Sequence, residues 1–280
     1  MATSIKQYDQ KLVSAANSVL LEIAHLLHSY ADSFVIVGGS VPNLILGNTQ
    51  EAHIGSIDVD IALDHNEIQD SSYRPIQKLL LDQGYEQEEQ PFTFSRLVQT
   101  NGQQIKVKVD FLTGEYGGTP KKHRTQRVQD MRPRKARACD LAFEQSISVM
   151  IKGVLPDGGK DQVTVQVASI VPFLMMKAQA LNGRMKEKDA YDIYFCLRNY
   201  PGGHEALVEA FQRFTSNKLI DEGLNILKDK FNSPEHVGPV FVANFLSETD
   251  LETRARIQRD AYERMNSLLL SLDILHDQPD

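Results

Sequence analysis

The sequence predicts an α/β (α+β) protein, with a small mixed sheet in its first part and a helical domain after it. Two segments, 57–63 and 105–112, alternate apolar and charged residues, which is the period of a strand. The apolar segment 34–37 stops at a Gly-Gly-Ser turn, and from about residue 170 the pattern is helical. We therefore expect an α/β domain over residues 1–168 and a helical domain over 169–280.

The other elements follow from periodicity and from turn residues. The expected helices of the first domain lie at 8–30, 41–46 and 73–83, the second opened by Ser40 and Pro42. The expected strands lie at 34–37, 57–63, 92–99, 105–112, 147–154 and 162–168. Asn101-Gly102 joins one strand pair as a hairpin, and Pro156 to Gly159 joins another. Breaks in the helical domain are expected at 201–203 and 233–234.

Composition excludes several classes of protein. Hydrophobic residues make up 41% of the 280 residues and charged residues 24%, which is ordinary for a globular chain rather than a disordered one. No apolar run approaches the roughly 20 residues that a membrane span needs, so no membrane association is expected. The first 30 residues are typical of an amphipathic helix rather than a signal peptide. The two cysteines, Cys139 and Cys196, form no CxxC, and we expect a cytoplasmic protein.

Charge is concentrated in one segment. Residues 121–137 contain eight Lys or Arg against the single acid Asp130, so this basic segment carries +7 while the whole chain carries −7. Such an acidic body with one basic segment indicates an anionic partner, and a solvated loop without a ligand is the alternative. No aromatic residue stands between the charges, so a base-stacking surface is not expected there.

Three carboxylates are candidates for a metal site. Asp58 and Asp60 are two apart on a predicted strand and so share one face of it. If the strand carrying Asp110 lies beside theirs, the three acids come together, and Mg²⁺ or Mn²⁺ is the natural counterion. Gly38, Gly39 and Ser40 end a strand and open a helix, where backbone amides and a hydroxyl can bind phosphate. Neither a GxGxxG motif nor a P-loop is present.

These motifs together resemble the DNA polymerase β-like nucleotidyltransferase superfamily. The resemblance covers about residues 30–115 and rests on Val37-Gly38-Gly39-Ser40, Asp58-Val59-Asp60 and Val109-Asp110-Phe111. It implies a nucleotidyltransferase fold, with Asp58, Asp60 and Asp110 as catalytic metal ligands and the glycine turn as the nucleotide phosphate site.

A second match is more specific. Residues 177–184 (KAQALNGR) and 188–193 (KDAYDI) are similar to a motif of AbiEii-type nucleotidyltransferases, which include toxins of toxin–antitoxin systems. That resemblance implies that Lys177, Asp189 and Asp192 lie near the nucleotide, and it implies a possible antitoxin partner. The alternative is a pair of surface salt bridges, Arg184–Asp189 or Lys188–Asp192. The chain departs from the superfamily where an Arg often stands four positions before the Asp-x-Asp, because Ile54 is there, with His53 adjacent.

The expected reaction moves a nucleoside monophosphate from a nucleoside triphosphate to an acceptor hydroxyl. An RNA end such as that of tRNA, bound through 121–137, is the favoured acceptor, with a protein hydroxyl and an antibiotic-like small molecule as alternatives. A non-catalytic relative that binds nucleotides is the alternative of another class, and the presence of all three acids argues against it.

Overall fold

The computed structural model describes residues 4–47, 49, 51–68, 75–100, 102–115, 123–214 and 217–273. The chain forms two compact units. The α/β unit comprises Tyr8–Ile45 and Gly55–Pro172, and the helical unit comprises Met1–Gln7, Leu46–Ile54 and Phe173–Asp280. The expected fold class is confirmed. The sequence predicts two continuous domains that meet at residue 168. In the structure, the segment Leu46–Ile54, which precedes the strand that carries Asp60, belongs to the helical unit.

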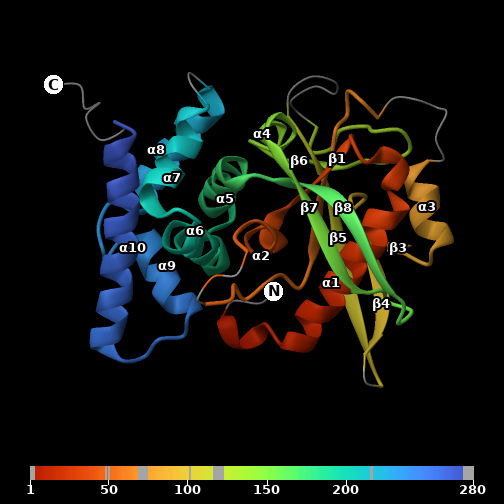
Figure 1. Cartoon of the computed structure of the whole chain (residues 1–280), viewed down its shortest axis with the longest axis horizontal. Helices are drawn as coiled ribbons and strands as arrows, with labels where there is room; N and C mark the ends of the chain where they lie inside the picture. Colours follow the sequence, from red (N-terminus) through yellow and green to blue (C-terminus); the bar gives the residue numbers. More distant parts are fainter. Residues whose placement is uncertain are drawn as a thin grey trace. The chain divides into compact units, whose positions relative to one another are not determined.

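The α/β unit is built on one mixed sheet (Figure 1). Its strands are β1 (Phe34–Val37), β2 (Val59–Leu63), β3 (Glu86–Gln87), β4 (Thr93–Thr100), β5 (Gln103–Thr113), β6 (Arg134–Lys135), β7 (Ser146–Val154) and β8 (Lys160–Ala168). They lie in the order β3-β4-β5-β2-β1-β8-β7, with β6 beside β5. The β2–β5, β1–β8 and β5–β6 pairs are parallel and the other pairs are antiparallel. The strand positions expected from the sequence are therefore confirmed to within a few residues.

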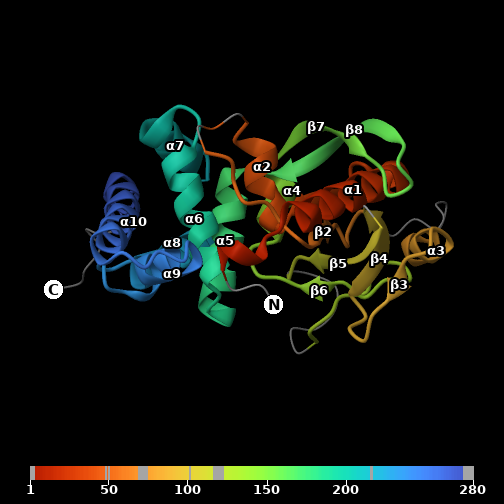
Figure 2. The ribbon, with the colours of Figure 1, turned by 90° about the horizontal axis from the view of Figure 1, so that it is seen from below.

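Helix α1 (Gln10–Leu26) covers one face of this sheet (Figure 2). Asp9 caps the helix by accepting a hydrogen bond of 2.8 Å from the amide of Lys11. The helix ends at Leu26, earlier than the expected residue 30, because a 3₁₀ turn follows at His28–Tyr30. On β4, Arg96 donates to Glu22 of α1, which places Arg96 on the covered face.

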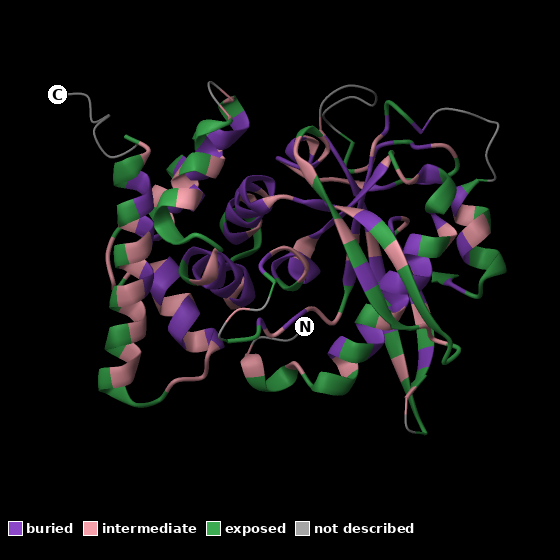
Figure 3. Cartoon of the chain, viewed as in Figure 1, coloured by how far each residue is buried: buried purple, intermediate pink, exposed green. Residues whose placement is uncertain are grey.

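Register then fixes which side chains share that face. Arg96 is paired with Val107, so Val107, Val109 and Phe111 of β5 also face α1, and all three are at most 1% exposed. The intervening residues of β5, Lys106, Lys108 and Asp110, lie on the opposite face. The burial pattern of β5 shows the same alternation, and Figure 3 shows how buried and exposed residues are distributed over the chain.

Three short helices complete the α/β unit: α2 (Val41–Ile45), α3 (Ile76–Asp82) and α4 (Asp140–Glu144). Helix α4 was not expected from the sequence, because five residues are too few to show a helical period. The described part of the expected helix at 73–83 begins at Ile76. The predictions for Tyr73, Asn101, Lys121 and Lys122 lie outside the described residues.

The helical unit contains α6 (Glu187–Asn199), α7 (Gly203–Gln212), α8 (Lys218–Lys230), α9 (Val237–Phe245), α10 (Leu251–Ser271) and most of α5 (Ile170–Arg184). Helix α10 packs against α6, α7, α8 and α9 through Ala261, Met265, Leu268 and Leu269, which are at most 2% exposed. Asp250 caps it by accepting a hydrogen bond from the amide of Thr253. The expected break at 233–234 falls between α8 and α9, and the expected break at 201–203 overlaps the first residue of α7.

Candidate active site and the buried charge network

The Gly38–Ser40 turn fits closely against a carboxylate of the next strand. Gly38 has φ +72°, in the left-handed region that glycine adopts most readily. A Cβ at Gly38 would lie 1.9 Å from Oδ2 of Asp60, so a side chain cannot occupy this position without moving that carboxylate. Ser40 is buried at 7% exposure, at the start of α2. The phosphate-binding turn expected from the sequence thus lies directly beside one of the expected metal ligands.

The parallel β2–β5 pair brings the carboxylates together. Asp60 and Asp110 are register partners, so their side chains emerge side by side on the face opposite α1. Asp58 precedes Asp60 by two residues, just before β2 begins, and is exposed, while Asp60 and Asp110 are half-buried. The adjacency of the two strands, which the sequence argument required, is therefore present.

Thr93 is a neighbour of the acids that sequence reasoning did not identify. It is the register partner of Asp110 on β4, and its hydroxyl donates a hydrogen bond of 2.5 Å to Asp110 Oδ1. Thr93 is 8% exposed, so this contact is shielded from competing water. The threonine holds the third carboxylate in one orientation, and only the pairing of β4 with β5 reveals it.

The three acids form a donor set of the kind that Mg²⁺ or Mn²⁺ binds, since hard divalent ions prefer carboxylate oxygens. Asp60 and Asp110 share one face of two hydrogen-bonded strands, Asp58 lies just before β2, and all three acids reach solvent. Among the described residues, no three His, Cys, Asp or Glu side chains converge closely enough to hold one ion. An ion held by all three acids would therefore require their side chains to rotate toward one another.

The other expected nucleotide-binding residues belong to the helical unit and form a buried charge network. Lys177 of α5 lies 2.9 Å from Asp189 Oδ1 and 2.7 Å from Asp192 Oδ2, both on α6. Arg184 donates two hydrogen bonds of 2.7 Å to the Asp189 carboxylate, and Lys188 forms an ion pair with Asp192. Both aspartates are 0% exposed and both lysines are at most 8% exposed. The Arg184–Asp189 and Lys188–Asp192 pairs named as a surface alternative do form, but their carboxylates are buried.

His53 completes the network from the segment Leu46–Ile54. Its Nε2 lies 2.9 Å from Asp192 Oδ1, and its side chain is 1% exposed. The ring stacks on Tyr191 at 5.4 Å between centroids and meets the edge of Phe195 at 4.8 Å. The only sequence signal for His53 was indirect, because it is the neighbour of the position where relatives often have an arginine.

Burial and charge set the protonation states of the network. Burial alone would raise the pKa of Asp192, but Lys177 and Lys188 hold it well below its ordinary value. Burial lowers the pKa of His53 from 6.5 to about 4, assisted by Lys188, against the opposing effect of Asp192. His53 is therefore neutral at physiological pH and donates its Nε2 proton to Asp192. The network then holds three cations, Lys177, Arg184 and Lys188, against two carboxylates.

The described part of the basic segment forms a small hairpin, which we call the basic hairpin (residues 124–135). Its strands meet through the Gln126 amide and the Pro133 carbonyl at 3.0 Å, and Gln129 turns the chain at φ +52°. Its last two residues form β6, in which Arg134 is the register partner of Leu112, two residues beyond Asp110. The hairpin is thereby anchored at the end of the strand that carries the third acid.

The basic hairpin directs its charge outward. Arg124, Arg127 and Arg132 are exposed, while Val128 and Met131 are 1% exposed. The guanidinium groups of Arg124 and Arg134 lie 5.3 and 5.6 Å from the centroid of the Phe92 ring. This ring is 4% exposed, so it supports the arginines and is not free to stack on a base.

Comparison with known proteins identifies the family. No curated protein and no solved structure matches the chain. None of the described helices is long and apolar enough to cross a membrane. A sequence model described as "Nucleotidyl transferase AbiEii toxin, Type IV TA system" matches residues 25–275, which include the glycine turn, the three acids and the buried charge network. The chain therefore belongs to the AbiEii nucleotidyltransferase family.

Proposed function

We propose that this protein transfers a nucleoside monophosphate from a nucleoside triphosphate to an acceptor hydroxyl, in a metal-dependent reaction that releases pyrophosphate. The observation that carries the proposal is the register pairing of Asp60 with Asp110, with Asp58 two residues before Asp60 and the Gly38 turn against Asp60. Family membership supports nucleotidyl transfer in general.

The α/β unit supplies the groups that such a reaction needs. The Gly39 amide and the Ser40 hydroxyl would bind the β- and γ-phosphates. Asp110, oriented by Thr93, would accept the proton of the acceptor hydroxyl. The hydroxyl oxygen would then attack the α-phosphorus as the bond to pyrophosphate breaks. Asp58, Asp60 and Asp110 would hold Mg²⁺ or Mn²⁺, which when bound supplies charge neutralisation and lowers the pKa of the attacking hydroxyl.

Lys177 of the helical unit is proposed to neutralise charge on the phosphates, as the AbiEii resemblance implies. Asp189 and Asp192 keep this lysine protonated, since they hold its pKa above the ordinary value in spite of burial. The aspartates would thus act on the nucleotide through Lys177 and not through contacts of their own.

We infer that the acceptor is an RNA end, such as that of tRNA. The basic hairpin carries three exposed arginines and is anchored two register positions from Asp110, so an RNA backbone bound there would run beside the third acid. Modification of RNA would fit action as a toxin with an antitoxin partner, and the description of the family contains the words "toxin" and "Type IV TA system".

A transfer assay tests the reaction. Purified protein is incubated with Mg²⁺ or Mn²⁺, total tRNA and each α-³²P-labelled nucleoside triphosphate. We expect label in RNA for wild type and for Asp64→Asn, which changes another acid that follows β2, and loss of label for Asp58→Asn and Asp60→Asn. Equal labelling by all variants, with folding verified by circular dichroism, would refute the catalytic assignment.

The RNA assignment has its own test. Replacing Arg124, Arg127 and Arg132 by Gln removes three exposed charges from the basic hairpin. Each phosphate contact to a single strand contributes about −0.7 to the slope of log K against log salt, so the slope should become shallower by about 2. An unchanged slope would exclude the hairpin as the RNA site, and label on protein instead of RNA would identify a protein acceptor.

A further inference from the structure

The two edges of the sheet differ in how they are protected. One edge ends in β3, a strand of two residues that begins with Glu86, and short charged edge strands resist further pairing. The other edge is β7, a strand of nine residues with no proline and the single charge of Lys152. Within the described part of the chain, β7 pairs only with β8. Met150 and Val154 on this edge are 56% and 48% exposed.

The hydrogen bonds to β8 show which backbone groups of β7 face outward. The Ser169 amide donates to the Gln145 carbonyl at 3.1 Å, and the Leu155 amide donates to the Gly159 carbonyl at 2.7 Å. These bonds are in register with the β7–β8 ladder. Because hydrogen-bonded pairs alternate in an antiparallel ladder, the odd-numbered residues of β7 point toward β8. The amides and carbonyls of the even-numbered residues, from Ser146 to Val154, therefore point to the open edge.

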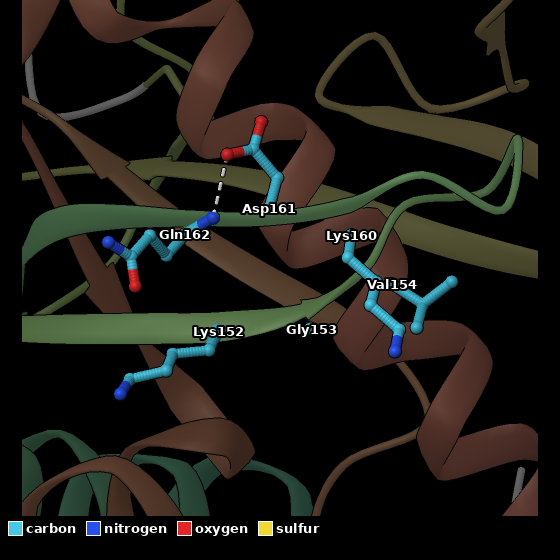
Figure 4. A pocket seen from close by; sticks show the side chains of 6 residues that line it. All are labelled: Lys152, Gly153, Val154, Lys160, Asp161 and Gln162. Atoms are coloured by element: carbon cyan, nitrogen blue, oxygen red, sulfur yellow. Dashed lines mark hydrogen bonds between the residues drawn. The ribbon is translucent and has the colours of Figure 1, made fainter.

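The end of the edge strand is open to solvent. A hollow of about 550 Å³ lies on the β7–β8 hairpin, and Figure 4 shows the side chains that line it: Lys152, Gly153, Val154, Lys160, Asp161 and Gln162. On the covered face, a Cβ at Gly153 would lie 3.6 Å from Leu21 of α1, so this side of β7 rests on the core.

We propose that β7 pairs with β7 of a second copy of this chain, antiparallel and centred on Met150, so that two sheets become one. The sequence of the strand is complementary to itself in this register. Ser148 falls opposite Lys152, Ile147 opposite Gly153, and Val149 opposite Ile151. The one charged residue of the strand thus meets a hydroxyl and not its own copy, and the bulkier Ile147 meets a glycine.

The backbone satisfies the same register. A two-fold axis at Met150 pairs even-numbered residues with even-numbered residues, and these are the residues whose amides and carbonyls face the open edge. A register shifted by one residue would pair outward-facing groups with inward-facing ones. A strand of a different protein would not need β7 to be complementary to itself about a two-fold axis. Because β7 has this complementarity, a second copy of the chain is the favoured occupant.

Engineered cysteines test the register. Across a hydrogen-bonded antiparallel pair the Cα atoms are about 5.5 Å apart, within the range that a disulfide spans. Met150→Cys should therefore form an intermolecular disulfide under mild oxidation. Ser148→Cys lies on the same exposed face but is displaced from its own copy by about four residues of strand, roughly 14 Å. Background is low because Cys139 and Cys196 are buried.

We expect wild type to show twice its 31.5 kDa mass by light scattering, and Met150→Cys to cross-link at least about tenfold faster than Ser148→Cys. Met150→Lys places like charges opposite each other at an exposed position and should give a folded monomer. A wild-type monomer at high concentration overturns the proposal. A dimer that survives Met150→Lys, or one that cross-links equally at both positions, also overturns it because it uses another surface.

Discussion

The neutral state of buried His53 predicts a specific loss of stability in mild acid. The pKa of His53 is 6.5 in an unfolded chain and about 4 in the folded protein, because its ring is buried and Lys188 is near. Between these values the unfolded state binds a proton that the folded state excludes. The free energy of unfolding therefore falls as the pH falls from about 6.5 toward 4.

The magnitude follows from the same shift. One pKa unit corresponds to about 1.4 kcal/mol, so complete titration would remove about 3 kcal/mol. Between pH 7.5 and pH 5.0 the loss from His53 should be about 2 kcal/mol. This is a large fraction of the 5–15 kcal/mol by which domains are typically stable.

The assay is urea unfolding at pH 7.5 and pH 5.0, followed by far-ultraviolet circular dichroism, for wild type and His53→Gln. Glutamine does not titrate, and its amide can still donate to Asp192. Every other histidine is present in both proteins, so the difference between the two pH dependences isolates His53. We expect wild type to lose about 2 kcal/mol more than the variant. A parallel loss in both proteins would show that His53 is not held neutral by its surroundings.

Four further substitutions give expected outcomes. Asp192→Asn leaves buried cations without their carboxylate and should cost about 3–5 kcal/mol, measured by urea unfolding. Gly38→Ala should disrupt nucleotidyl transfer because its Cβ would overlap the Asp60 carboxylate. Gly47→Ala is the control, because Gly47 also has a positive φ (+66°) but has open space around it. It should cost about 1–2 kcal/mol of unfolding free energy and leave transfer intact. Glu22→Gln weakens a buried carboxylate that accepts three side-chain donors and should lower the thermal midpoint by several degrees, with unchanged transfer per folded molecule.

Much of the fold was readable from local pattern. The strand at 34–37 and the hairpin strands around residues 93–113 were predicted because alternation, β-branched residues and Gly-containing turns agree there. The pairing of Asp60 with Asp110 could only be hypothesised, since the sequence does not state which strands are neighbours. Once β2 and β5 are adjacent, the period of two residues places both carboxylates on one face.

The features that sequence reasoning missed depend on distant partners. His53 and Asp192 are 139 positions apart, and nothing local to His53 indicates a buried hydrogen bond. Thr93 becomes a partner of Asp110 only through the β4–β5 register. The basic segment showed its charge but not its hairpin, because the pairing that folds it involves two isolated bridges and a two-residue strand.

Burial differs between the two sets of aspartates that the two family resemblances indicated. Asp58, Asp60 and Asp110 reach solvent, so a cation can approach them and their substitution should abolish transfer with little change in stability. Asp189 and Asp192 are fully buried and paired with Lys177, Arg184 and Lys188, and as anions they would repel a nucleotide phosphate rather than bind it. Their substitution should instead unfold the helical unit or misplace Lys177. We therefore expect stability measurements to distinguish aspartates that serve chemistry from aspartates that position a lysine, where activity alone does not.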